Sequence, residues 1–357
     1  MNLRTQAATA WSHSVPASVS ASLPPAPSAV VQGGELLSGR YESRAGDAIR
    51  VGEVDWSGLD AAVKRSPFWR WTHHKRWQYV GIGSPELFVG LAVVDLGWCT
   101  TAFAYVFDRL LQRVVADWDA LGLPGLCGAV SSRPLAGSQA WFRSPGARVS
   151  VRHRSNDLIT VRLRAGTFHL RANLDLRDAP PVLVAVGEPL GGLAHCTHKT
   201  SALRVTGELE VDGVSWSLAH ASACLDSSNG LLARDTAWRW ASAHRPGLGF
   251  NLQQGYFGNH ENALWLDGDL IPLGAATFTF DPIRPMSTWH VATDDGLLDL
   301  VFQPQGARCA DQQALIASSR YIQPVGLFSG TVRRTPNGAP VAVEQLLGVT
   351  EDHHSVW

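Results

Sequence analysis

Alternating apolar and polar residues, broken by short turn sequences, run through the middle of the chain. The pattern covers Ala147–Arg154, Leu158–Arg164 and Thr167–Asp175, with turns expected at Ser155–Asp157 and Ala165–Gly166. A side-chain period of two is typical of a β-strand with one buried face, and such short turns join antiparallel neighbours. This stretch therefore predicts an antiparallel meander.

Further turn signals extend this prediction to the rest of the chain. Four Asp-Gly or Asn-Gly pairs favour tight hairpins: Asp212–Gly213, Asp267–Gly268, Asp295–Gly296 and Asn337–Gly338. A helix is expected only near residues 55–65, ending at Pro67. No alternation of strands with helices and no GxGxxG sequence is present, so a nucleotide-binding α/β fold is not expected. The sequence predicts an all-β protein with few short helices.

Charge and composition limit the partners. The net charge is −1 over 357 residues, so no basic excess favours nucleic acid. No apolar stretch is long enough for a transmembrane helix, so no integral membrane segment is expected. The five cysteines include no CxxC pair, which favours reduced, buried thiols and a cytoplasmic location.

Composition also suggests how the chain is divided. Residues 1–35 are rich in Ala, Ser and Pro and are predicted to be a disordered extension. The composition changes near Pro180–Pro181 and Gly191–Gly192, which suggests an N-terminal β-domain at 36–195 and a C-terminal one at 196–357. Each part is long enough for an eight-stranded barrel.

Seven ordered strings give the chain a family resemblance. They are Lys75–Tyr79, Asp95–Trp98, His198–Thr200, Leu225–Gly230, Trp238–Ala241, Glu261–Gly268 and Gly348–His353. Their order and spacing over residues 36–357 resemble the bacterial domain-of-unknown-function family 2804. That family is distantly similar to carotenoid hydratase and AttH-like proteins. The resemblance implies two lipocalin-like β-barrel or sandwich domains packed together.

Two departures limit what the resemblance implies about chemistry. Trp98 stands where the family is expected to have a tyrosine, and Ser227–Asn229 follow Asp226 where carotenoid hydratases carry a cluster with His and Trp. Only Asp226 and the downstream Trp238 and Trp240 carry over.

Asp226 is the first candidate catalytic residue. In an apolar, Trp-lined cavity a carboxyl group has a raised pKa and can donate a proton. Trp238 and Trp240 are two residues apart, so on a strand they share a face, where they either fill the core or line a ligand pocket. The alternative for Asp226 is structural, because Asp226–Gly230 also fits an Asx-turn that closes a hairpin.

Glu261 is the second candidate acid. It follows a loop with hydrogen-bonding side chains, Tyr256, Asn259 and His260, which suit the orientation of a polar group on a mostly apolar ligand. A solvated loop with no ligand is the alternative.

The remaining candidates come from the matched strings and from the end of the sequence. His198 and Lys199 could provide a cationic partner for a carboxylate, or lie at an exposed strand end. Asp352 and His353 belong to a final strand that closes a barrel, and could also reach a cavity. His195 and His198 would point to opposite faces of a strand, and HExxH is absent. We therefore expect no metal and no cofactor.

These observations predict a soluble protein that binds a hydrophobic small molecule, lipid- or isoprenoid-like, in a Trp-lined pocket. The catalytic hypothesis is acid-assisted hydration, isomerisation or cyclisation, by a lyase or isomerase without a metal. The alternative is a non-catalytic lipid-binding or carrier protein, and a carbohydrate-active β-protein ranks third. The sequence does not fix the oligomeric state.

Overall fold

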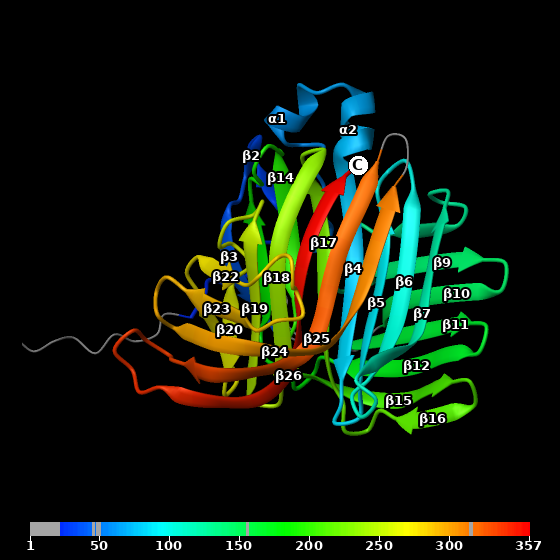
Figure 1. The fold of residues 1–357 in the computed structure, drawn as a ribbon. Helices are drawn as coiled ribbons and strands as arrows, with labels where there is room; N and C mark the ends of the chain where they lie inside the picture. Colours follow the sequence, from blue (N-terminus) through cyan, green and yellow to red (C-terminus); the bar gives the residue numbers. More distant parts are fainter. Residues whose placement is uncertain (1–21, 45–46, 48–50, 155–156, 314–316) are drawn as a thin grey trace, which may run out of the picture.

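The computed structural model describes residues 22–44, 47, 51–154, 157–313 and 317–357. Over these residues the protein is mostly β, with 61% strand and 3% helix, which confirms the predicted fold class. Two large antiparallel sheets lie side by side, and two short helices lie at one end of the molecule (Figure 1). None of the helices in the described ranges has the length and apolar character to cross a membrane.

The first sheet forms a nearly closed barrel. Its main path runs β7-β6-β5-β4-β17-β15-β12-β11-β10-β9-β8. Its strands are β3 (Gly39–Ser43), β4 (His74–Gly83), β5 (Leu87–Asp95), β6 (Thr100–Asp108), β7 (Arg113–Gly122), β8 (Gly128–Val130), β9 (Gln139–Ser144), β10 (Ala147–Arg154), β11 (Leu158–Ala165), β12 (Phe168–Asp175), β13 (Val182–Gly187), β14 (Ala194–Lys199), β15 (Leu203–Val211), β16 (Val214–Ser217) and β17 (Ser222–Leu231).

The second sheet forms a half-barrel in the order β21-β20-β19-β18-β26-β25-β24-β23-β22. Its strands are β18 (Asp235–Arg245), β19 (Leu248–Gly255), β20 (Ala263–Leu266), β21 (Asp269–Pro272), β22 (Ala276–Thr279), β23 (Trp289–Thr293), β24 (Leu298–Gln313), β25 (Ser318–Val332) and β26 (Val341–Val356). The chain passes from one sheet to the other between β17 and β18, whereas the predicted division at 195/196 falls within β14. The predicted domain division stays a prediction.

The predicted meander is present as β10, β11 and β12, in continuous antiparallel register. The Asp212–Gly213 and Asp267–Gly268 pairs form tight turns, and all four residues have positive φ, as type I′ hairpins require. The expected turn at residues 155–157 falls partly outside the described residues, since 155 and 156 are not among them.

One local prediction is wrong and another is incomplete. Residues 22–35, assigned to a disordered extension, include most of the hairpin of β1 (Val31–Gln32) and β2 (Glu35–Leu36). Ala26 and Val30 there belong to a buried apolar cluster that includes Trp56. The helix expected near residues 55–65 is present as α1 (Asp60–Val63) and ends before Pro67, but a second helix, α2 (Pro67–His73), was not expected and has Pro67 in its first turn. Ser66 caps α2 by accepting the Trp69 N–H, and proline suits a first turn because no intrahelical donor is lost.

Three of the buried apolar clusters determine where a ligand could bind. One fills the first barrel, with residues such as Val89, Val161 and Leu209, and another fills the half-barrel, with residues such as Phe250 and Trp289. The third lies between the two sheets and is rich in aromatic residues. Because both barrel interiors are packed with apolar side chains, a ligand site is expected between the two sheets.

Candidate functional site

A cavity of about 120 Å³ lies between the two sheets. Both sheets contribute to its wall, and most of the lining side chains are aromatic. The lining residues are Trp77, Tyr79, Ala92, Val94, Phe103, Lys199, Asp226, Trp238, Trp240, Gln253, Tyr256, Glu261, Tyr321, Gln323, Glu351, His353 and Trp357.

The first sheet provides one wall of the cavity through a single row of cross-strand neighbours. Lys199 pairs with Asp226, Asp226 with Tyr79, Tyr79 with Ala92, and Ala92 with Phe103. Directly paired residues of antiparallel strands project to the same face. Strand register alone therefore brings these five side chains to the cavity.

The second sheet provides the opposite wall in the same way. Trp240 pairs with both Gln253 and Glu351, and one row further along Trp238 pairs with His353. The Trp238 and His353 rings lie 4.0 Å apart. Trp240 meets Tyr79 of the first sheet edge to face, with ring centroids 5.5 Å apart.

A buried charge cluster spans the two walls. The Lys199 Nζ lies 2.5 Å from Asp226 Oδ2 and 3.0 Å from Glu261 Oε2. Burial would lower the pKa of Lys199, but the two carboxylates outweigh that effect and raise it. Lys199 therefore stays charged and holds both carboxyl groups at the cavity wall.

The two carboxyl groups have different surroundings. Asp226 also accepts hydrogen bonds from the hydroxyls of Thr197 (3.3 Å) and Ser228 (3.1 Å). Glu261 is buried, and burial raises its pKa although the nearby Lys199 opposes the shift. Glu261 is therefore the candidate proton donor of the cluster.

A hydrogen-bond chain fixes the loop that carries Glu261. The Trp240 indole donates to Asn251 Oδ1 (2.9 Å), and the Asn251 amide donates to the Glu261 carbonyl (2.9 Å). Asn262 Oδ1 accepts the Gln253 N–H (2.7 Å). These bonds explain why Glu261, although in a loop, has a defined position.

A third carboxyl group, Glu351, was not among the predicted site residues. Its Oε1 accepts from the Trp238 indole (3.0 Å) and lies 3.0 Å from His353 Nδ1. Its Oε2 accepts from the Gln323 amide (2.7 Å), and Gln323 accepts from the Tyr105 hydroxyl (2.5 Å). Strand alternation could have identified Glu351, because it lies two residues before the predicted His353.

Three buried polar side chains of the cavity wall have no hydrogen-bond partner among the described residues. They are the Gln253 amide and the hydroxyls of Tyr79 and Tyr321. Burial of an unpaired polar group costs about 1–3 kcal/mol. A ligand or water with polar atoms in this cavity would remove that cost.

The structure brings together seven of the eleven predicted site residues. Those that line the cavity are Asp226, Glu261, Trp238, Trp240, Tyr256, Lys199 and His353. The other four do not line it. His198 projects from the opposite face of β14, beside Cys196, and Asp352 pairs with Arg239 on the other face of its sheet. Asn259 is exposed, and His260 stacks on Phe257.

The expected turn at Asp226–Gly230 is wrong. These residues lie inside β17, which is paired with β14 on one side and with β4 on the other. Because both neighbours are present, the backbone groups are satisfied in the sheet and the side chains of Asp226 and Asn229 are free to bond across strands. The expected opposite orientation of His195 and His198 on a strand agrees with their positions in β14.

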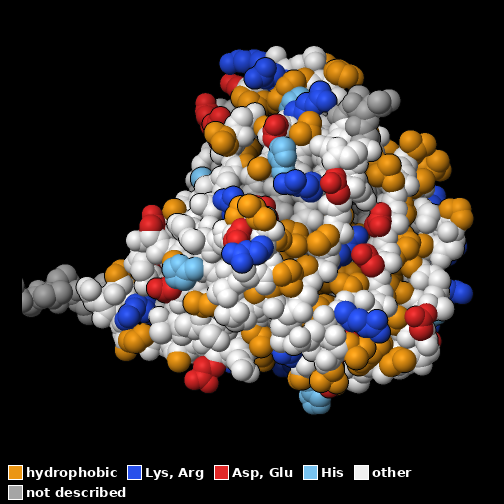
Figure 2. All heavy atoms as spheres, viewed as in Figure 1, with side chains coloured by type: hydrophobic (Ala, Val, Ile, Leu, Met, Phe, Trp, Pro, Cys, Tyr) orange, Lys and Arg blue, Asp and Glu red, His pale blue; other side chains and the backbone are white. Residues whose placement is uncertain are grey.

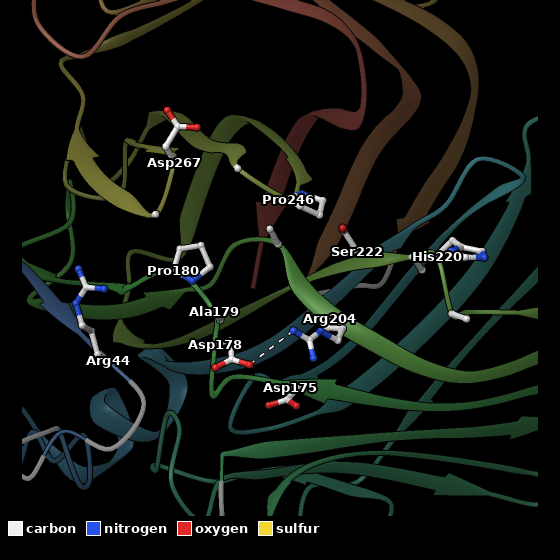
Figure 3. Close-up of a pocket in the computed structure, with 15 residues that line it drawn as sticks. Arg44, Asp175, Asp178, Ala179, Pro180, Arg204, His220, Ser222, Pro246 and Asp267 are labelled. Carbon is white, nitrogen blue, oxygen red and sulfur yellow. Dashed lines mark ion pairs between the residues drawn. The ribbon is translucent and has the colours of Figure 1, made fainter.

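A larger groove of about 720 Å³ lies elsewhere on the molecule (Figure 3). Its charged residues are largely exposed, and the Arg204–Asp178 pair, 3.6 Å apart, is solvated on both sides. Among the residues that the structure describes, His220 is the one aromatic side chain that lines it. The cavity between the sheets therefore remains the candidate site.

The protein is mostly β, and its two barrel-like sheets have a cavity between them. These features are those of proteins with two lipocalin-like domains. The family model described as a domain of unknown function, DUF2804, matches residues 51–357. The chain belongs to this family, which confirms the resemblance found in the sequence.

Two solved structures with a TM-score of at least 0.50 have a similar fold. An AttH-like protein from Nitrosomonas europaea matches with a TM-score of 0.54 and 14% identity, covering 78% of this chain and 92% of that one. CghA matches with a TM-score of 0.50 and 11% identity, covering 94% and 97%. Kievitone hydratase from Nectria haematococca matches with a TM-score of 0.48 and 12% identity, covering 79% and 88%. The curated protein sequences gave no significant match.

Proposed function

We propose that the protein binds a small, largely apolar molecule in the cavity between its sheets and transfers a proton to it from Glu261. The observation that supports this most is the Glu261 carboxyl group, buried at the wall of an aromatic cavity with a raised pKa. A proton donor is most effective when its pKa lies near the working pH, and burial moves a carboxylic acid in that direction.

The reaction class follows from the surroundings of this acid. A proton passing from Glu261 to a carbon–carbon double bond leaves a carbocation, which the faces of Trp238 and Trp240 can stabilise. Water that adds to the cation forms a C–O bond and returns a proton to the Glu261 carboxylate, which completes a hydration. Transfer of a different carbon-bound proton to the Glu261 carboxylate gives isomerisation. Attack by a second double bond forms a C–C bond and a new cation, which gives cyclisation when it loses a proton to the same carboxylate.

The size and the charge of the cavity limit which ligands it can bind. A cavity of 150 Å³ holds benzene, so about 120 Å³ holds a group of similar or smaller size. A long isoprenoid would place only its reacting end there. Three carboxyl groups, Asp226, Glu261 and Glu351, face a single lysine. This excess of acidic groups disfavours a ligand that is anionic at its buried end.

Non-catalytic binding is the second candidate. The unpartnered Gln253, Tyr79 and Tyr321 would suit a carrier as well as an enzyme, because they need only accept or donate hydrogen bonds to a bound molecule. The structure of CghA was solved with Sch210972, so a protein of this fold is found with a small molecule. The predicted cytoplasmic location stays a prediction.

Native mass spectrometry of the purified protein, followed by extraction and identification of any co-purified molecule, would supply the ligand. Incubation of that molecule with the protein in D₂O then tests proton transfer, read as deuterium incorporation by NMR. We expect Glu261→Gln to bind the molecule but to incorporate deuterium at least about a hundredfold more slowly. Glu344→Gln, on an exposed position of β26, is the matched control and should behave as the wild type.

Each outcome has a definite meaning. Binding without deuterium incorporation in the wild type would support the carrier. Unchanged incorporation in Glu261→Gln would refute the catalytic role of Glu261. Absence of any bound molecule, with no binding of small apolar compounds measured by tryptophan fluorescence, would contradict both candidates.

A further inference from the structure

Helix α2 presents large apolar side chains to solvent. Phe68 is 70% exposed, Trp71 is 49% exposed, and Val63 of the preceding α1 is 57% exposed. The Phe68 and Trp71 rings lie 5.8 Å apart, so they form one patch. Neighbouring exposed aromatics on a short helix need an explanation, because single exposed apolar residues are common but clusters mark contact sites.

Positive charge surrounds this patch. Residues 61–85 contain five Lys or Arg residues and no Asp or Glu. Lys75 is buried and Arg76 pairs with Asp95, which leaves Lys64, Arg65 and Arg70 nearest the patch. Burial lowers the pKa of His73 in α2, and Lys75, Arg65 and Arg234 lower it further.

Acidic residues also lie near the patch, since Glu53, Asp55 and Asp60 are exposed. Asp55 accepts the Ser57 N–H and hydroxyl, and the Asp60 carboxyl lies against Gly34 of the β1–β2 turn. We call the patch with its cations the α2 surface. It consists of Val63, Lys64, Arg65, Phe68, Arg70 and Trp71.

The α2 surface is connected directly to the cavity. Helix α2 continues into β4, whose Trp77 and Tyr79 line the cavity. The Lys75 ammonium joins the two elements, since it donates to the Thr72 and Leu96 carbonyls at 2.8 Å each. Figure 1 places α1 and α2 at the same end of the molecule as the C-terminus, and the C-terminal Trp357 lines the cavity.

A second exposed apolar group lies at the same end of the first sheet. Leu121, Leu123 and Leu126 are each more than 60% exposed. Gly122, the last residue of β7, is linked to Arg76 of β4 by the cross-strand pairs Gly122–Thr100, Thr100–Asp95 and Asp95–Arg76. Three strand spacings, or about 14 Å, therefore separate the end of β7 from the start of β4. Figure 2 shows hydrophobic, basic and some acidic side chains at the top of the view, where α1 and α2 lie, and further hydrophobic ones at the upper right.

We propose that the α2 surface docks on a lipid bilayer with anionic head groups. Aromatic side chains partition into the interface of a bilayer, and lysine and arginine are attracted to its negative surface potential. A protein partner is less favoured, because the exposed apolar area is too small for a stable protein interface. Docking would place one end of the cavity near the source of a hydrophobic ligand. Only this last step rests on the proposed function.

Vesicle co-sedimentation of the full chain tests the proposal without any knowledge of the ligand. The vesicles are phosphatidylcholine alone or phosphatidylcholine with 30 mol% phosphatidylglycerol, about a physiological share of anionic lipid. We expect binding to the anionic vesicles that weakens in high salt. Phe68→Ser/Trp71→Ser should weaken this binding at least about tenfold, and Lys64→Gln/Arg65→Gln should remove most of its salt dependence. Ile283→Ser, at a residue 89% exposed in another loop, is the matched control.

The outcomes separate this proposal from the proposed function. A wild type that binds neither vesicle, or a control that loses as much binding as Phe68→Ser/Trp71→Ser, would overturn docking. The circular dichroism of each variant is compared with the wild type, so that a folding defect is recognised. Ligand binding in vesicle-free solution should be unchanged in Phe68→Ser/Trp71→Ser. If this variant lost both ligand binding and vesicle binding, the substitutions in α2 would have changed the cavity itself. That result would also overturn the proposal.

Discussion

Glu351 and Asp352 are neighbours in the chain, but their side chains lie on opposite faces of β26. Glu351 joins Trp238, Gln323 and His353 at the cavity, whereas Asp352 forms an ion pair with the half-exposed Arg239. The predicted pair Asp352 and His353 could not share a cavity, because adjacent residues of a strand alternate in direction.

This pair of neighbours offers a matched test of the site. Glu351→Gln removes the charge that accepts three hydrogen bonds, so we expect a loss of about 1–3 kcal/mol in the free energy of unfolding and weaker ligand binding. Asp352→Asn should change the free energy of unfolding by less than about 0.5 kcal/mol, since surface ion pairs contribute little. Urea unfolding of both variants measures the difference, and equal effects would contradict the assignment of Glu351 to the site.

At the level of residues, the sequence identified the charged centre but not its complete composition. Asp226, Glu261 and Lys199 come from separate matched strings, and the structure joins them within 3.0 Å. Trp77, Tyr79 and Phe103 were missed, because an aromatic residue in a buried strand has the same local pattern whether it fills a core or lines a cavity. Only the cross-strand register and the packing of one sheet on the other separate these cases.

At the level of elements, strands with one buried face were predictable and β17 was not. Its Asp-Ser-Ser-Asn-Gly sequence is typical of a turn, yet every residue from Ala223 to Leu231 is buried. Strands β14 and β4 on either side, and packed layers on both faces, supply partners for its polar groups. The Asn229 amide oxygen, for example, accepts from the Trp56 indole at 2.9 Å. Such tertiary partners override local propensity and leave no alternating pattern to detect.

Strand β14 should make the protein sensitive to acid. Burial lowers the pKa of His198 to about 3 and that of His195 well below its ordinary value. The unfolded chain therefore binds more protons than the folded protein once the pH falls below about 6.5, and stability is lost from there towards pH 3. For His198 alone the loss at pH 5 is about 2 kcal/mol.

Unfolding by urea at several pH values measures this effect. We expect the free energy of unfolding of His198→Gln to depend less steeply on pH between 7 and 5 than that of the wild type, whatever its absolute stability. His220→Gln, at an exposed histidine, should leave the slope unchanged. A wild type with the same stability at pH 7 and pH 5 would show that these histidines are not held neutral by folding.

At the level of the whole molecule, the cavity belongs to neither barrel. The interior of each is filled by its own apolar cluster, and the aromatic walls of the cavity are the outer faces of both sheets. Sequence patterns predict which face of a strand is buried, but β17 and most of β4 are buried on both faces here. The sequence left open whether a ligand lies within a domain or between the two, because the answer depends on how the sheets pack on each other.

Contacts between the sheets should make them unfold together. Besides the charge cluster, the Trp265 indole donates to the Pro181 carbonyl (2.7 Å), and Arg308 of β24 pairs with Asp117 of β7 (2.8 Å). Arg308 is 3% exposed and lies over the ring of Phe103, 4.5 Å from its centroid. An interface that is apolar, aromatic and ion-paired is expected to couple two sheets in one cooperative transition.

Replacing Arg308 tests this coupling. In Arg308→Leu the partly exposed Asp117 can be hydrated, so the cost is mainly lost packing and the lost cation–π contact, about 1–3 kcal/mol in the free energy of unfolding. We expect a lower urea midpoint with the transitions followed by circular dichroism and by tryptophan fluorescence still coincident. Arg284→Leu, on an exposed loop, should leave the midpoint in place. Two separated transitions in the wild type would contradict this coupling and would show that one sheet stays folded after the other has unfolded. The cavity could then open without unfolding of the whole protein.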